Sequence, residues 1–215
     1  SREREREGTM KKAHSLISIF FIFSAVIHGG ATRKKSVNDP IRTFQSDNMQ
    51  VDRVYYILPA VPGSGGRVSL SPSSGNSSRS SVIQENSEAA DGVQILFTPA
   101  NPNDTFVRAS TDVMIEFTET QSSAANPPSG VWQIGPYDEE AKLYFVTIGG
   151  VRGPPGAGTV RSWFKIEKDG FFYNLRYCPS VCKTCNVLCK NVGIYKDKFA
   201  RRLALVDPPF KVMFR

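Results

Sequence analysis

Short apolar runs separated by turn-forming residues recur along the chain from residue 55 to the C-terminal end. In many runs apolar and polar positions alternate with a period of two, so that Val113, Ile115 and Phe117 share one side. Side chains of a β-strand point alternately to the two faces of a sheet, and this period is therefore typical of strands. After the N-terminal region, no stretch longer than about 10 residues keeps the helical period of 3.6 residues. The pattern predicts a protein built from strands.

The breaks between these runs are rich in glycine, proline, serine and asparagine, which favour turns. They are Pro62–Gly66, Pro72–Ser81, Asn101–Asp104, Asn126–Gly130 and Gly149–Gly158. Many short strands with regularly spaced turns indicate an all-β barrel or sandwich. The chain has 215 residues, enough for one domain with a sizeable core. We expect a single all-β domain, with an exposed loop in the serine-rich segment 69–81.

The N-terminal region has the order of features found in a secretory signal. Two lysines follow Met10, an apolar run extends from Leu16 to Ile27, and small residues surround the expected cleavage site near Gly30 or Ala31. A membrane-spanning helix needs about 20 apolar residues, so a membrane anchor is the less favoured alternative. Residues 10–30 are interpreted as a signal peptide. We therefore expect a secreted protein, extracellular or vacuolar, with no membrane contact after signal cleavage.

The segments on either side of this signal complete the expected organisation. Residues 1–9 alternate arginine with glutamate ahead of a start methionine, and we interpret them as a leader that does not belong to the natural protein. Residues 31–43 are expected to be a flexible lead-in, and residues 44–215 the folded domain. The formal net charge of +7 is scattered along the chain rather than gathered in a stripe. That distribution predicts no nucleic-acid partner.

Four cysteines, Cys178, Cys182, Cys185 and Cys189, lie close together near the C-terminal end. A tetrathiolate zinc site is one interpretation, but its two cysteine pairs usually come from separate knuckles with a longer spacer. Secretion favours oxidation, and hence two disulfides and no metal. Four cysteines allow three pairings, and the spacing does not choose among them. Because all four can pair within the chain, we expect a monomer without interchain bridges.

Both histidines, His14 and His28, lie in the expected signal peptide. A mature chain without histidine can form neither a Ser–His nor a Cys–His dyad. The segment Gly153–Gly158 is interrupted by proline and precedes a strand rather than a helix, so it is interpreted as a turn and not as a phosphate-binding loop. We therefore expect neither an enzyme nor a cofactor.

Several motifs resemble those of the plant Kunitz-type protease-inhibitor family, the family of soybean trypsin inhibitor. They are Tyr55–Ala60, Gly149–Gly156, Trp163–Lys168, Tyr177–Cys182, Val192–Ile194, Arg201–Leu205 and Pro209–Val212. The similarity covers residues 44–215, and the cysteine spacing resembles the miraculin-like branch. The resemblance implies a β-trefoil of three four-stranded units. It also implies a nested pairing, with Cys178 joined to Cys189 and Cys182 to Cys185.

Inhibitors of this family present a rigid convex loop, one side chain of which fills the primary specificity pocket of a serine protease. The resemblance places the reactive loop between Phe97–Pro99 and Val113–Phe117, with a tip formed by Asn101, Pro102, Asn103, Asp104 and Thr105. Asn103 or Asp104 then takes the position of the specificity residue. Trypsin requires arginine or lysine there, and the nearest, Arg108, lies close to the following strand. We therefore expect weak or absent trypsin inhibition.

Two Asn-x-Ser/Thr sequons predict N-glycosylation, one at Asn76 and one at Asn103. A glycan on Asn103 would block docking of the loop. The asparagine that supports the loop in the family would align near Val51, or at Asn48 if a gap shifts the alignment.

The first disulfide of the family is missing, because no cysteine occurs near Ser78 or near Ala125 and Asn126. Two functions therefore compete. The first is a secreted, inhibitor-like defence protein that acts on secreted or digestive proteases, of the serine class, through a substrate-like loop. The second is a non-inhibitory, miraculin-like trefoil that binds a carbohydrate or a protein.

Overall fold

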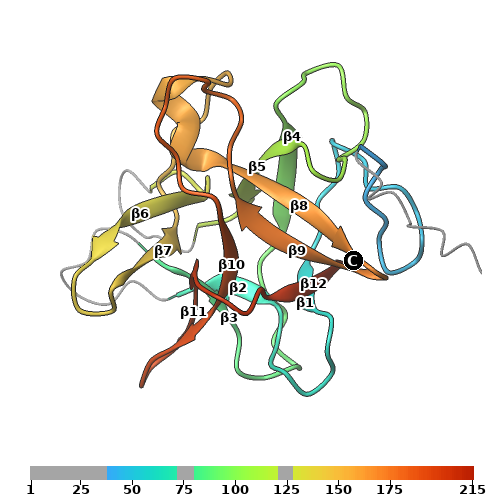
Figure 1. Cartoon of the computed structure of the whole chain (residues 1–215). Helices are drawn as coiled ribbons and strands as arrows, with labels where there is room; N and C mark the ends of the chain where they lie inside the picture. Colours follow the sequence, from blue (N-terminus) through green and yellow to red (C-terminus); the bar gives the residue numbers. More distant parts are fainter. Residues whose placement is uncertain (1–37, 72–79, 121–127) are drawn as a thin grey trace, which may run out of the picture. The chain divides into compact units, whose positions relative to one another are not determined.

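The structure is a computed structural model and describes residues 38–71, 80–120 and 128–215. Almost all regular structure is β, as the period-two pattern predicts (Figure 1). The elements are β1 (Ile57–Pro59), β2 (Val68–Leu70), β3 (Val82–Gln84), β4 (Ile95–Pro99), β5 (Asp112–Phe117), β6 (Gln133–Asp138), β7 (Leu143–Thr147), a short 3-10 helix η1 (Ala157–Ser162), β8 (Trp163–Asp169), β9 (Phe172–Tyr177), β10 (Lys190–Lys196), β11 (Arg201–Leu205) and β12 (Lys211–Phe214). Within the described residues no helix is long and apolar enough to span a bilayer.

Six of the strands close into a ring of antiparallel pairs. β1 pairs with β12, β12 with β9, β9 with β8, β8 with β5, and β5 with β4. A bridge between Tyr55 and Ile95 then joins the chain entering β1 to β4 and completes the ring. A closed ring leaves no strand edge unpaired, which protects such a sheet against edge-to-edge aggregation.

The other six strands form three hairpins, β2–β3, β6–β7 and β10–β11, which contact one another. Arg201 of β11 pairs with Gln84 of β3, and Ala204 of β11 pairs with Phe145 of β7. A bridge between Ser81 and Thr147 links the remaining two hairpins. A six-stranded ring capped by three hairpins is a β-trefoil, and the expected fold class is confirmed as a single domain.

The interior of the ring is filled by apolar side chains from alternate strand positions. Val113, Ile115 and Phe117 of β5 are buried in the main core, as their period predicts. Aromatic rings pack edge to face within it, for example Phe97 against Phe214. The opposite side of β5 is also covered, because Met114 packs with Val131 and Trp163 in a second, smaller cluster. This strand is therefore buried on both faces where it follows the β4–β5 loop.

Residues 38–43, the described part of the expected lead-in over residues 31–43, pack against the trefoil. Ile41 is fully buried in the core, and its amide donates to the carbonyl of Val107 at 2.8 Å. Asn38 and Asp39 form further backbone hydrogen bonds with Ala109. The described part of the lead-in is therefore held by both packing and hydrogen bonds. The expected leader, the signal peptide and residues 31–37 lie outside the described residues.

The serine-rich segment 69–81 is likewise not an exposed loop throughout. Ser69 and Leu70 belong to strand β2, and Ser80 and Ser81 are buried beside the β6–β7 hairpin. Each described end of the segment contributes strand or bridge hydrogen bonds. The middle of the segment, residues 72–79, lies outside the described residues.

Candidate functional site

The connection between β4 and β5, Ala100–Thr111, is the segment in which we expect the reactive loop, and we refer to it by that name. Its tip is the most exposed part, with Asn101, Pro102, Asn103 and Thr105 open to solvent. Figure 1 shows the loop as a projecting light-green connection, with the blue N-terminal segment beside it. All five residues expected at the tip therefore lie together at one surface position between two buried strands.

The tip folds as a hydrogen-bonded turn. The amide of Asp104 donates to the carbonyl of Asn101 at 3.1 Å, and the amide of Asn103 donates to the side-chain Oδ1 of Asn101 at 3.2 Å. Asparagine commonly stabilises turns in this way, because its side-chain oxygen accepts a hydrogen bond from the backbone amide two residues further on. Residue Asn103 is exposed, and its side chain takes part in neither of these two hydrogen bonds.

The C-terminal side of the loop is held by the N-terminal segment. Val107 is fully buried; its amide donates to the carbonyl of Met49 at 2.9 Å, and its carbonyl accepts from Ile41. The amide of Val51 donates to the carbonyl of Thr105 at 3.2 Å. Backbone bonds on both sides of Val107, together with burial of Ile41 and Met49 in the core, fix this half of the loop before any partner binds.

Position 51, one of the two expected for the loop-supporting asparagine, does contact the loop, but through the backbone of a valine. The other candidate, Asn48, is exposed and forms a bridge with Arg42 instead. No described residue therefore supplies the side-chain amide contact that the resemblance implies from either position. Support for the loop comes from main-chain hydrogen bonds.

Arg108 is the basic residue nearest the tip, and its side chain is already engaged. Its Nε lies 3.5 Å from Oδ1 of Asp104, and its Nη1 donates to the carbonyl of Asn38 at 3.1 Å. Arg108 also forms a backbone bridge with Pro40. These contacts hold the guanidinium between Asp104 and the carbonyl of Asn38 in the N-terminal segment.

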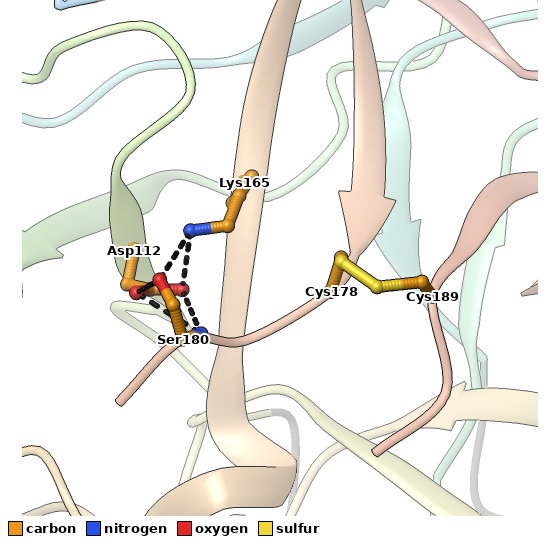
Figure 2. The surroundings of a disulfide bond; sticks show 5 residues. All are labelled: Asp112, Lys165, Cys178, Ser180 and Cys189. Atoms are coloured by element: carbon orange, nitrogen blue, oxygen red, sulfur yellow. Dashed lines mark hydrogen bonds and ion pairs between the residues drawn. A yellow bond between two sulfur atoms is a disulfide. The ribbon is translucent and has the colours of Figure 1, made fainter. Parts of the chain in front are cut away.

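Asp112 closes the base of the loop. Its carbonyl accepts from the amide of Ala100 at 2.9 Å, and its carboxylate accepts from Nζ of Lys165 at 2.9 Å. The amide and hydroxyl of Ser180 also donate to this carboxylate, as Figure 2 shows. Lys165 Nζ lies 2.9 Å from Oγ of Ser180 as well. One carboxylate thus joins the loop base, strand β8 and the segment after Cys178. No local sequence pattern indicates this cluster, because Asp112 lies 53 residues from Lys165 and 68 residues from Ser180 along the chain.

All four cysteines form disulfides in the structure. Cys178 is bonded to Cys189 and Cys182 to Cys185, which is the nested pairing that the resemblance implies. The outer bridge joins the end of β9 to the start of β10 (Figure 2). No group of three or more potential metal ligands occurs among the described residues. The positions where the family's first disulfide would lie, Ser78 and residues 125–126, fall outside the described residues, as does the sequon at Asn76.

The protein is therefore a β-trefoil with an exposed β4–β5 loop whose flanks are buried and hydrogen-bonded. Comparisons with known proteins identify the family. A family model described as trypsin and protease inhibitor, of the legume Kunitz type, matches residues 44–215. The chain belongs to this family, and the expected resemblance is confirmed.

Individual relatives agree with this assignment. The chain is 37% identical to Kunitz trypsin inhibitor 5 of Arabidopsis thaliana, over 94% of this chain and 97% of that protein. It is 38% identical to miraculin of Synsepalum dulcificum, over 95% of this chain and 97% of the relative. Among solved structures, a Kunitz-type cysteine protease inhibitor from potato superposes with a TM-score of 0.69 at 32% identity, covering 83% of this chain and 97% of the other.

Proposed function

We propose that this chain is a secreted protease-binding inhibitor that acts through the tip Asn101–Thr105. We further propose that its target accepts asparagine, rather than arginine or lysine, in the primary specificity pocket. The observation that carries the proposal is the exposed Asn103 side chain on a loop whose flanks are buried and hydrogen-bonded. A preformed loop lowers the entropy lost on binding, which is how a short segment can bind a protease tightly.

The chemistry of the tip argues against trypsin as the target. The pocket of trypsin holds a carboxylate that pairs with a basic side chain. Asn103 carries no charge, and the guanidinium of Arg108 is committed to Asp104 and to the carbonyl of Asn38. A pocket that both donates and accepts hydrogen bonds suits the amide of asparagine. We therefore propose an asparagine-accepting endopeptidase as the target.

Secretion belongs to the same proposal. A signal peptide over residues 10–30 would lead the chain into an oxidising compartment, where disulfides persist. Both bridges found near the C-terminal end suit that environment. With both histidines confined to the signal region, the secreted chain has none for a hydrolase dyad, so we propose a binding role rather than an enzymatic one.

A non-inhibitory binding protein is the second candidate, and the turn at the tip favours it. A substrate-like loop lies extended in a protease cleft, whereas Asp104 and Asn103 both donate to Asn101 here. Extending the tip breaks these two hydrogen bonds, each of which contributes about 0.5–1.5 kcal/mol. The exposed sequon at Asn103 favours the same candidate, because a glycan on that side chain would prevent docking.

Titration of the purified protein against trypsin, chymotrypsin, subtilisin, papain and an asparagine-specific endopeptidase tests the proposal. We expect stoichiometric inhibition of the last enzyme and at least tenfold weaker inhibition by Asn103→Ala. The control Gln45→Ala, at an exposed position in the turn between Ile41 and Met49, should inhibit as the natural chain does. Nanomolar inhibition of trypsin would overturn the proposed specificity, and inhibition of none of the five would favour the second candidate.

Mass spectrometry of the intact protein, with and without glycan removal, separates the two candidates further. Thr105→Ala removes the sequon at Asn103 and leaves the asparagine in place. If Asn103 is glycosylated, only the Thr105→Ala protein should inhibit a protease. Full glycan occupancy at Asn103 in the natural protein would therefore contradict an inhibitory role for this loop.

A further inference from the structure

An open pocket of about 640 Å³ lies beside Cys189, away from the tip of the reactive loop. Three of its lining residues, Lys142, Arg176 and Lys190, carry positive charge, and one, Asp207, carries negative charge. Leu143, Leu205 and Val206 supply an apolar part of the lining. The pocket is therefore cationic on one part of its wall and apolar on another.

Arg176 occupies a particular place in the sheet. It lies opposite Lys165 of β8 on one side and opposite Asn191 of β10 on the other. Residues directly opposite in an antiparallel pair project to the same face, so two cations are neighbours in this row. Lys165 is neutralised by Asp112. No described residue hydrogen-bonds to the buried Nε of Arg176.

The remaining charges of the pocket leave its cations available. The one acid, Asp207, accepts a hydrogen bond from Nδ2 of Asn191 at 2.8 Å. Lys142 lies 3.5 Å from Glu139, but both side chains are mostly exposed, so this ion pair is weak. Lys190 is exposed at the start of β10, directly after the disulfide. The excess of positive charge therefore faces the pocket rather than an internal partner.

We propose that this pocket binds a small organic phosphate or sulfate ester. An arginine guanidinium matches the geometry of a tetrahedral oxoanion and can donate two parallel hydrogen bonds to it. A turn of the Arg176 side chain brings its Nε and one Nη into the pocket, which satisfies the donor that has no partner in the described part of the chain. Lys190 and Lys142 add charge at the rim. The organic part of the ester lies along Leu143, Leu205 and Val206.

Isothermal titration calorimetry with phenyl phosphate, phenyl sulfate, glucose 6-phosphate and inorganic phosphate, at constant ionic strength, tests the proposal. We expect the phenyl esters to bind more tightly than inorganic phosphate, because only they contact the apolar wall. Comparison of the affinities for phenyl phosphate and phenyl sulfate identifies which oxoanion the pocket prefers. Arg176→Gln should weaken phenyl ester binding at least tenfold, and Lys190→Gln should weaken it to a smaller extent.

Lys198→Gln is the matched control, because it removes one exposed positive charge at the β10–β11 turn, outside this pocket. It should bind phenyl phosphate as the natural chain does. Circular dichroism verifies that each variant is folded. If the Arg176→Gln variant does not fold, Lys190→Gln provides an independent test. Equal loss in Lys198→Gln and Arg176→Gln would mean that only the overall charge attracts the anion, and would overturn the proposal. The absence of binding by any ester would overturn it too, and equal affinity for inorganic phosphate would refute the preference for an ester.

Discussion

Asp112 and Lys165 lie directly opposite each other in the antiparallel pair β5–β8, and their side chains form an ion pair with an N–O distance of 2.9 Å. Both side chains are nearly buried, with 9% and 13% of their surface exposed. The carbonyl of Asp112 also accepts from Ala100 across the base of the reactive loop. The end of the loop is therefore joined to strand β8 through a single residue.

Removal of Asp112 should destabilise the fold strongly. Asp112→Ala leaves the ammonium of Lys165 buried without its partner, and such a change usually costs about 3–5 kcal/mol of unfolding free energy. Glu116→Ala on the same strand is the matched control, because its partner Arg152 is 71% exposed. That control should cost about 1 kcal/mol or less. Urea unfolding measures both, and equal losses would show that the buried pair contributes no more than an exposed one.

The N-terminal segment should control the order of the reactive loop. Met49→Ala opens a cavity in the core and should cost about 2–5 kcal/mol. Because the carbonyl of Met49 accepts from the amide of Val107, hydrogen exchange at Val107 should accelerate beyond the change seen in the strands. Met213→Ala, at a partly exposed position of β12, is the control and should leave exchange at Val107 unchanged. Uniform acceleration in both variants would contradict a specific role for Met49.

Much of the ring of strands could be predicted from the sequence, because each strand carries its own period. The alternation over Val113–Phe117 places β5 and its core face correctly. It does not reveal that Val131 and Trp163 cover the other face at Met114, since those contacts come from distant parts of the chain. The connection between β4 and β5 is predictable for a similar reason, because it lies between two runs with the strand period; its role as the reactive loop is what the family resemblance implies.

The supports of the loop could not be predicted in the same way. Ile41 and Met49 form hydrogen bonds with Val107 through backbone atoms. Because every residue type except proline has both of these backbone groups, such hydrogen bonds cannot be recognised from the sequence. An isolated apolar residue such as Ile41, in a mostly polar segment, does not by itself indicate that the segment packs against the domain. The Asp112–Lys165–Ser180 cluster was missed because an ion pair across two strands depends on register, which no local pattern reports.

A basic residue at the tip should make the protein bind trypsin more tightly. Asn103→Arg places a guanidinium at the exposed position that we assign to the specificity pocket. A hydrogen-bonded contact with a charged group contributes about 1.5–3 kcal/mol, and each 1.4 kcal/mol is a factor of ten, so trypsin binding should tighten by about 10–100-fold. Gln45→Arg adds the same charge away from the loop and should have no effect. Equal gains in the two variants would refute the assignment of Asn103.

The two disulfides should contribute unequally to stability. Cys178 and Cys189 are 11 residues apart, whereas Cys182 and Cys185 are only 3 apart. Loop-closure entropy rises with the length of the closed loop, so replacing the outer pair by serine should cost about 3 kcal/mol and replacing the inner pair about 1 kcal/mol less. Thermal unfolding of the two double variants measures this difference in stability.

Because Lys190 directly follows Cys189, loss of the outer bridge should also weaken phenyl phosphate binding, while loss of the inner bridge should not. Isothermal titration calorimetry of the same two variants measures the binding. A larger loss of stability from the inner pair would contradict the entropic argument, and unchanged phenyl phosphate binding in the outer-pair variant would show that Lys190 is positioned by β9 and β10 alone.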